Sequence, residues 1–236
     1  MIPGLPSTPF RLDRLRNASS QVFDHLRELI VTLAVAPGTQ LHRNELADYY
    51  GLSSTPLRDA LSRLGEEGLI DIVPQQTTTV SRIDVDAARQ AHLLRLSLEL
   101  EVAHTLARSP DAALALALEQ HIAQQRLAAQ MNDDAAFDRA VTAFHRLLFE
   151  RAHVADLWEL LQRQGGNLER LQRLRPRADA ERVLADHAGI AEAIAAGDGR
   201  LAMDRVRRCL GDALAGVEAI RERYPEYLAP GAGARG

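Results

Sequence analysis

Residues 53–58 carry side chains whose types suit contacts with a nucleic acid. The hydroxyl groups of Ser53, Ser54 and Thr55 can donate hydrogen bonds to phosphate oxygens, and the Arg58 guanidinium can bond two acceptor atoms on one guanine edge. Such contacts discriminate between sequences only when a rigid element holds the side chains in register with a groove of the duplex. The surrounding residues must therefore supply that element.

Residues 41–69 predict two short helices joined by a tight turn. The first has three apolar residues at helical spacing, Leu46, Ala47 and Tyr50. Gly51 follows at a position where a left-handed residue commonly ends a helix, and Pro56 suits the first turn of the next helix. The second helix has an apolar face formed by Leu57, Ala60, Leu61 and Leu64. This layout is typical of helix-turn-helix DNA-binding domains.

A small β-hairpin is predicted directly after the two helices. Residues 69–73 and 77–80 are rich in β-branched and apolar residues, and residues 74–76 lie between them as a turn. A hairpin in this place predicts a winged helix-turn-helix. The alternative is a helix pair with a hairpin inside some other small domain, because similar patterns occur in helical proteins that do not bind DNA.

From about residue 21 to 81 the chain resembles the DNA-binding domain of the GntR family of bacterial transcription regulators. Residues 37–41 match its P-G-T-x-L motif, and residues 45–47 match its E-L-A motif. Residues 51–61 (GLSSTPLRDAL) and 67–69 (EGL) match the motifs of its second helix. The resemblance implies a homodimer that reads a two-fold symmetric operator in double-stranded DNA.

The chain departs from the family pattern at three places. Ser54 stands where the family usually has Arg, and Asn44 stands where some members carry a DNA-contacting Arg. The wing tip at 74–77 lacks the usual glycines and basic residue. We therefore expect an uncommon operator sequence. The expected DNA-contacting residues are Arg43, Asn44, Ser53, Ser54, Thr55, Arg58, Arg63, Gln75 and Gln76.

Composition limits the function classes. The 236 residues are 46% hydrophobic, with no apolar run near the ~20 residues that span a bilayer, so we expect no membrane partner. The single cysteine cannot form an internal disulfide, which favours the cytoplasm. Residues 1–83 hold eight Arg and nine acidic residues, a net charge of −1. DNA affinity must therefore depend on where the charges lie, as in a basic arm with Arg11, Arg14 and Arg16.

The expected fold is mainly α, with four segments. Residues 1–18 are expected to form a flexible arm, 19–81 the winged helix-turn-helix domain, and 225–236 a disordered tail. The long segment at 84–224 is expected to be an all-helical, antiparallel bundle that binds an effector and dimerises. Its helices are predicted at 84–108, 111–130, 134–151, 154–174, 178–196 and 199–223. The helix before the reader is predicted from residue 21 to about 34, with Ser20 as its cap.

The bundle resembles the FCD effector-binding domain of the FadR branch of the same family, over about residues 84–220. Residues 95–99 match its R-x-x-L-E motif, and 143–146 match its F-H motif. Residues 187–198 match H-x-x-I-x-x-A-I-x-x-G-D. The matches are looser than those of the reader, but they come in the same order and spacing. The resemblance implies a small-molecule site inside this bundle.

The FCD resemblance also implies a divalent metal site, which in that branch uses one Asp and three His. This chain keeps His145 and His187, but Val141 stands at the Asp position and Cys209 at the third His. A set of two imidazoles and a thiolate would suit Zn²⁺, and Asp138 could partly replace the missing oxygen donor. The alternative is a site without metal, in which His145 and His187 hydrogen-bond an effector directly.

Arg95 lies among leucines in the first helix of the bundle and suggests an acidic effector. An inward-facing Arg would bind a carboxylate through two hydrogen bonds. The alternative is a salt bridge with Glu99, four residues further on. Our hypothesis is a small organic acid that contacts Arg95, His145 and His187.

The leading prediction is a DNA-binding transcription regulator, and specifically a repressor whose operator affinity is modulated by a small organic acid. An effector-independent DNA-binding helical protein is the first alternative. A metal-dependent enzyme that uses His145, His187 and Cys209 is the second, but no acid–base pair or activated nucleophile occurs at motif spacing. We therefore expect no enzymatic activity.

Overall fold

The computed structural model describes residues 2–73, 76–176, 179–211 and 213–230. The chain divides into two compact units. The first contains Met1–Ala91, Arg163–Arg175 and Gly216–Gly236, and the second contains His92–Gln162 and Pro176–Ala215. The expected boundary near residue 84 therefore does not describe the packing, because two later segments return to the first unit.

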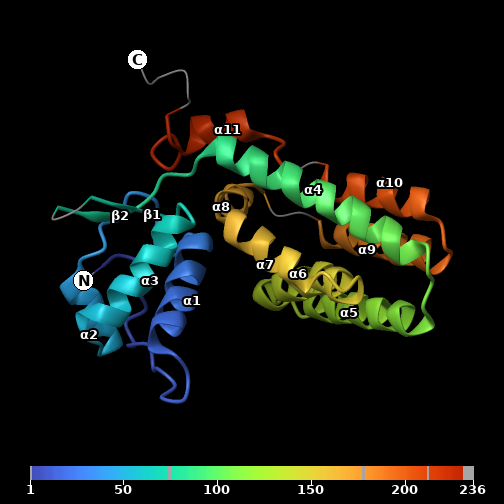
Figure 1. Cartoon of the computed structure of the whole chain (residues 1–236). Helices are drawn as coiled ribbons and strands as arrows, with labels where there is room; N and C mark the ends of the chain where they lie inside the picture. Colours follow the sequence, from blue (N-terminus) through green and yellow to red (C-terminus); the bar gives the residue numbers. More distant parts are fainter. Residues whose placement is uncertain (1, 74–75, 177–178, 212, 231–236) are drawn as a thin grey trace. The chain divides into compact units, whose positions relative to one another are not determined.

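The first unit contains the expected winged helix-turn-helix (Figure 1). Two antiparallel strands follow three helices, with Ile70 paired to Val80 and Ile72 to Thr78. Gln40, before the second helix, forms a further bridge with Thr79 at the edge of this hairpin. The elements are α1 (Ala18–Val31), α2 (Arg43–Tyr50), α3 (Ser54–Glu66), β1 (Ile70–Ile72) and β2 (Thr78–Val80).

The turn between α2 and α3 forms as the sequence predicts. Gly51 is left-handed, with φ +62°, and its N–H bonds the carbonyl groups at the end of α2. The apolar face of α3 is buried against α1. At the start of α1, however, Asn17 is the capping residue instead of Ser20, because its side-chain oxygen accepts from the Ser20 N–H at 3.0 Å.

The N-terminal segment is packed, which corrects the expectation of a flexible arm for residues 2–17. Ile2 is 2% exposed and belongs to the core of the first unit. Gly4 has φ +88°, and a Cβ there would lie 1.9 Å from the Ala34 carbonyl oxygen, so only glycine fits. The ring of Phe10 stacks on His25 of α1 at 4.2 Å between centroids.

Helix α8 (Gly166–Arg173) also belongs to the first unit. The Arg170 side chain is fully buried and donates to the Ser81 carbonyl oxygen at 2.7 Å and to Asn167 Oδ1 at 2.8 Å. Asn167 Oδ1 in turn accepts from the Asp84 N–H at 2.9 Å. These bonds fasten the segment that follows β2 to α8.

The C-terminal tail is ordered in its described part, residues 225–230, which corrects the expectation of disorder there; residues 231–236 lie outside the described chain. The Ile83 N–H bonds the Tyr227 carbonyl, and the Ala229 N–H bonds the Ile83 carbonyl. Leu228 is 3% exposed. The tail follows α11 (Val217–Arg223) and closes on residue 83 as a short parallel bridge.

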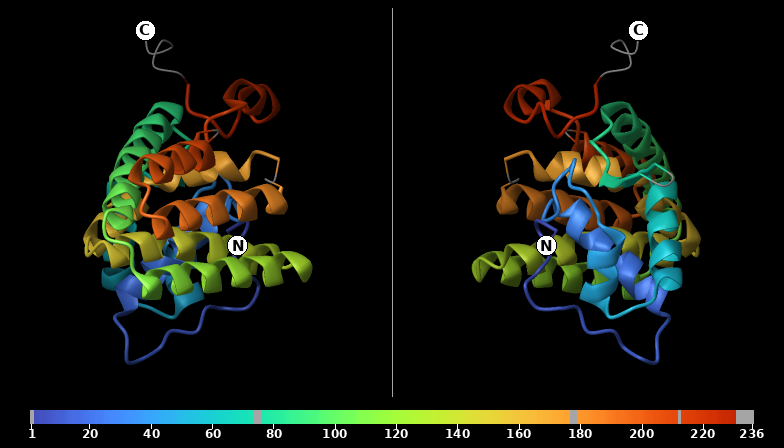
Figure 2. Two further views of the ribbon diagram at one scale, coloured as in Figure 1. Left: turned by 90° about the vertical axis from the view of Figure 1, so that its right-hand side faces the viewer. Right: turned by 90° about the vertical axis from the view of Figure 1, so that its left-hand side faces the viewer.

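The second unit is a bundle of antiparallel and neighbouring helices, as the fold prediction expects. Helix α5 packs against both α6 and α9, and α9 packs against α10 (Figure 2). Aromatic residues from α6 and α7, including Phe144, Phe149 and Trp158, lie in its core. The elements are most of α4 (Val85–Ala107) and α7 (Ala155–Gln164), with α5 (Ala112–Gln130), α6 (Asp134–Arg151), α9 (Ala180–Ala195) and α10 (Gly199–Leu210).

Two predicted long helices are each divided in the structure. The helix expected at 154–174 breaks at Gly165, between α7 and α8. A Cβ on the next residue, Gly166, would lie 2.7 Å from a methyl carbon of Leu69, so this glycine allows α8 to pack closely on the reader core. The helix expected at 199–223 ends at Leu210, and α11 begins only after Gly216, which has φ +76°. No described helix is long and apolar enough to cross a membrane.

Candidate functional site

The start of α3 presents four of the predicted DNA-contacting residues. Ser53 precedes the helix in an extended conformation, and its side chain makes no capping bond. Ser54 and Thr55 are exposed in the first turn. The Arg58 side chain is 71% exposed, with its Nε 3.8 Å from Asp59 Oδ1, a weak surface pair. The structure therefore brings these polar groups together on an open helix end.

A second group of predicted contacts lies between α2 and the wing. Arg43 and Asn44, in the first turn of α2, line one cleft together with Gln76 and Thr77 from the hairpin. Both α2 residues are exposed. The wing residue Gln75 lies outside the described residues.

Arg63 is separated from Arg58 on α3. Five positions along a helix correspond to a rotation of about 140°. The Arg63 guanidinium lies 3.8 Å from the ring centroid of Phe23 and donates to Ser20 Oγ at 3.5 Å, both on α1. Its charge therefore lies beside α1, at the edge of the reader surface.

In the second unit, three predicted residues from three helices converge. His145 of α6, His187 of α9 and Cys209 of α10 each offer one ligand atom, and these atoms lie within 4.8 Å of one another. The two histidines are 2% and 1% exposed. His145 Nδ1 lies 2.7 Å from Glu99 Oε2, and His187 Nδ1 lies 2.8 Å from Gln125 Oε1. Because each oxygen accepts from Nδ1–H, the Nε2 atoms are left to face another ligand.

Glu99 links this cluster to Arg95. Its carboxylate is fully buried and accepts from the Arg95 Nε at 2.7 Å as well as from His145. Burial by itself would raise the pKa of Glu99, but the charges of His145 and Arg95 outweigh it and lower the pKa to about 2. The ion pair of Arg95 with Glu99, the alternative stated above, is thus present, while the Arg95 side chain remains 24% exposed.

The other two members of the cluster are held uncharged. Burial, with repulsion from His145, lowers the pKa of His187 well below its ordinary value, so its ring is neutral. Burial, with the charges of Glu99 and Asp186, raises the pKa of the Cys209 thiol to about 12. A cation bound at Cys209 would have to displace its proton.

The residues present fit a metal ion with three protein ligands. Neutral His187, His145 with its Nδ1 held by a carboxylate, and a thiol are donors typical of Zn²⁺ with an open fourth position. Within the described chain Asp138 is not part of this group, so it does not replace the oxygen donor missing at Val141. Sequence reasoning missed Gln125, which no motif marks, and used Glu99 only as a partner of Arg95.

Comparisons with known proteins agree with both halves of the chain. The family model described as bacterial regulatory proteins, gntR family, matches residues 18–80, and the FCD domain model matches residues 90–212. The chain belongs to the GntR family of bacterial transcription regulators. It combines a GntR-type DNA-binding domain with an FCD domain, as both resemblances imply, and this family indicates a regulator and not an enzyme.

Two curated relatives span most of this GntR protein. An uncharacterized HTH-type transcriptional regulator from an unstable DNA locus of Streptomyces ambofaciens is 30% identical over 217 residues, 91% of each chain. The HTH-type transcriptional repressor RspR of Escherichia coli is 26% identical over 220 residues, 92% of this chain and 96% of RspR.

Two solved structures of GntR-type proteins share the fold. E. coli McbR/YncC has a TM-score of 0.72 at 18% identity, over 89% of this chain and 99% of that one. A putative GntR regulator from Rhodococcus sp. RHA1 has a TM-score of 0.68 at 20% identity, over 86% and 99%. The FCD match at 90–212 includes α8, which in this GntR chain packs with the DNA-binding unit.

Proposed function

We propose that this GntR regulator is a homodimeric repressor that binds a two-fold symmetric operator and responds to a small organic acid. The observation that carries the proposal is the open start of α3, where three hydroxyl side chains and Arg58 are exposed together. The printed name of RspR, a repressor, favours repression for this relative of it.

In this proposal the first turns of α3 enter the major groove. The Arg58 guanidinium bonds a guanine edge, and the hydroxyl groups of residues 53–55 bind flanking phosphates. Arg43 and Gln76 approach the backbone from the sides of the α2–wing cleft. Two subunits would place two such readers one helical turn apart on the duplex.

Replacing Arg58 with Gln is expected to weaken binding to the preferred duplex by roughly 5- to 150-fold, the loss of one two-bonded base contact. The variant should also relax the base preference at one position in each half-site. The duplex is first selected from a random library with the wild-type protein, and affinities are then measured by fluorescence anisotropy.

Arg89→Gln is the matched control, because Arg89 is an exposed arginine of α4 whose removal changes the charge equally. It should bind within about twofold of the wild type. A wild-type protein that selects no duplex at low salt would overturn the proposed function.

The proposed effector site is the buried cluster of the second unit. A carboxylate bound by Arg95 would lie beside Glu99 and the two histidines, where perturbed pKa values mark a candidate site. A Zn²⁺ ion held by His145, His187 and Cys209 would supply a Lewis-acidic position for an oxygen atom of the effector. The effector can change operator affinity only if it binds the two arrangements of the readers with different affinity.

Replacing Arg95 with Ala is expected to weaken the best-binding carboxylate by roughly 10- to 150-fold, the loss of charge-assisted hydrogen bonds. Calorimetry across a panel of small carboxylates identifies that ligand. Arg146→Ala is the matched control, since Arg146 also pairs with a glutamate four residues on, at 2.7 Å, but on an exposed surface.

The same preparations, purified without chelator, report on the metal. Stoichiometric zinc that is lost in His145→Ala would place the ion in the cluster, whereas its absence from the wild type leaves direct contact between effector and histidines. Wild-type affinity in Arg95→Ala would refute the assignment of Arg95. A metabolite library that stabilises the protein with no compound would favour an effector-independent regulator.

A further inference from the structure

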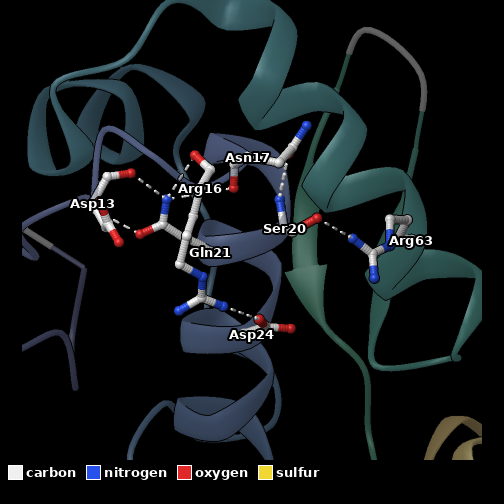
Figure 3. A network of polar contacts seen from close by, with 7 residues as sticks. All are labelled: Asp13, Arg16, Asn17, Ser20, Gln21, Asp24 and Arg63. Carbon is white, nitrogen blue, oxygen red and sulfur yellow. Dashed lines mark hydrogen bonds and ion pairs between the residues drawn. The ribbon is translucent and has the colours of Figure 1, made fainter.

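The turn at residues 13–16 is held in place by a buried glutamine (Figure 3). Gln21 of α1 is 5% exposed. Its Oε1 accepts from the Asp13 N–H at 2.8 Å, and its Nε2 donates to the carbonyl groups of Asp13 and Arg16 at 2.9 and 3.1 Å. Asp13 Oδ1 also accepts from the Leu15 N–H at 2.9 Å. The backbone of this turn is therefore fixed by four hydrogen bonds.

The fixed turn presents basic side chains to solvent. Arg11, Arg14 and Arg16 are all exposed, and Leu15 at the tip is 96% exposed. Arg16 lies 3.8 Å from Asp24, with both side chains more than half exposed, so this pair holds it weakly. Among the described residues, Arg11 and Arg14 make no ion pair. The Asp13 carboxylate is the acidic group within 11–16, and it is already bonded to the backbone.

The turn is connected to the reader through α1. Asn17, which directly follows it, caps α1 by accepting from the Ser20 N–H. Ser20 Oγ accepts from Arg63 of α3, and Figure 3 shows this chain of contacts from the turn to the reader helix. A duplex bound at α3 would therefore have the basic turn anchored beside the same helix.

Charge placement indicates the partner. Residues 1–83 have a net charge of −1, yet residues 11–16 hold three arginines against one aspartate, a local charge of +2. Phosphate neutralisation supplies most of the sequence-independent affinity of DNA-binding proteins. A domain with so little basic surplus must bind phosphates through such local concentrations.

We propose that residues 11–16 form a second DNA-binding element, in which Arg11 and Arg14 bind backbone phosphates beside the operator bases that α3 reads. The inference rests on the proposed function and extends it, because it assigns sequence-independent affinity to a segment outside the winged helix-turn-helix. The element requires the fixed turn, since Gln21 determines where the two side chains project.

The test is the salt dependence of binding by Arg11→Gln/Arg14→Gln. We expect the slope of log affinity against log salt to fall by roughly two, one for each phosphate contact. Between 50 and 200 mM salt the wild type should then lose about tenfold more affinity than the variant. The loss at low salt should be equal on the selected duplex and on a scrambled one, unlike the loss in Arg58→Gln.

Arg108→Gln/Arg139→Gln is the matched control, because it removes two exposed arginines from the second unit. It should keep the wild-type slope. Gln21→Met keeps both arginines but releases the turn, and it should give part of the same effect. An unchanged slope in Arg11→Gln/Arg14→Gln, or an equal change in the control, would overturn the inference while wild-type operator binding still supports the proposed function.

Discussion

Replacing Glu99 with Ala is expected to reduce the free energy of unfolding of the second unit by about 3 kcal/mol. The substitution removes one carboxylate that holds both Arg95 and His145 in a fully buried place. The His145 ring then loses its hydrogen-bond acceptor in the core. Because Arg95 is 24% exposed, water can partly solvate it, which keeps the expected loss at the lower end for broken buried pairs.

Trp158 fluorescence during urea unfolding measures this loss. The single tryptophan is 5% exposed in the core of the second unit, so its signal reports on that unit. A chelator is present throughout, so that no metal contributes to stability. Glu150→Ala, which breaks the exposed Arg146–Glu150 pair, should lose less than about 1 kcal/mol. Equal losses in the two variants would contradict a stabilising role for the Glu99 cluster.

Replacing Arg170 with Ala is expected to destabilise the first unit by roughly 3 kcal/mol, from an unpaired Ser81 carbonyl and a cavity. Burial lowers the pKa of Arg170 to about 10, so the fold holds this cation against a desolvation penalty. Arg170→Met fills the space and removes that penalty, and it should therefore lose only about 1–2 kcal/mol, for the unpaired carbonyl.

Hydrogen exchange and far-UV circular dichroism in urea measure the effect on the first unit. Amide groups near residues 81–84, which α8 holds through Asn167 and Arg170, should lose protection first. Arg173→Ala, an exposed arginine on the same helix, is the control and should change stability by under about 1 kcal/mol. If Arg170→Ala matched this control, the buried guanidinium would not be what holds α8 in place.

The reader could be predicted from sequence because its signals are local. Gly51 at the helix end and Pro56 in the next first turn act within a few residues of their own backbone. The division of 154–174 into two helices could not be predicted in this way. Arg170 appears in a polar stretch that looks solvent-exposed, and its burial depends on the Ser81 carbonyl, 89 positions earlier.

The same distinction applies to the N-terminal segment and to the cluster. Proline and polar residues at 1–18 suggest disorder, whereas the packing depends on the contact of Gly4 with the distant Ala34 carbonyl. His145, His187 and Cys209 followed from a family motif, and the structure brings them together. Gln125 could not be identified, because only the fold places its amide beside His187, 62 residues away.

The interleaved build of the first unit limits how the gene can be divided. A fragment that stops near residue 83 would leave Leu69, the Ser81 carbonyl and the Ile83 backbone without their covering segments. A chimaera that joins this reader to another sensor at one crossover would carry the same defect. Successful grafting would require three coding blocks to be transplanted together, so recombination among relatives should keep 163–175 and 216–230 with their own N-terminal half.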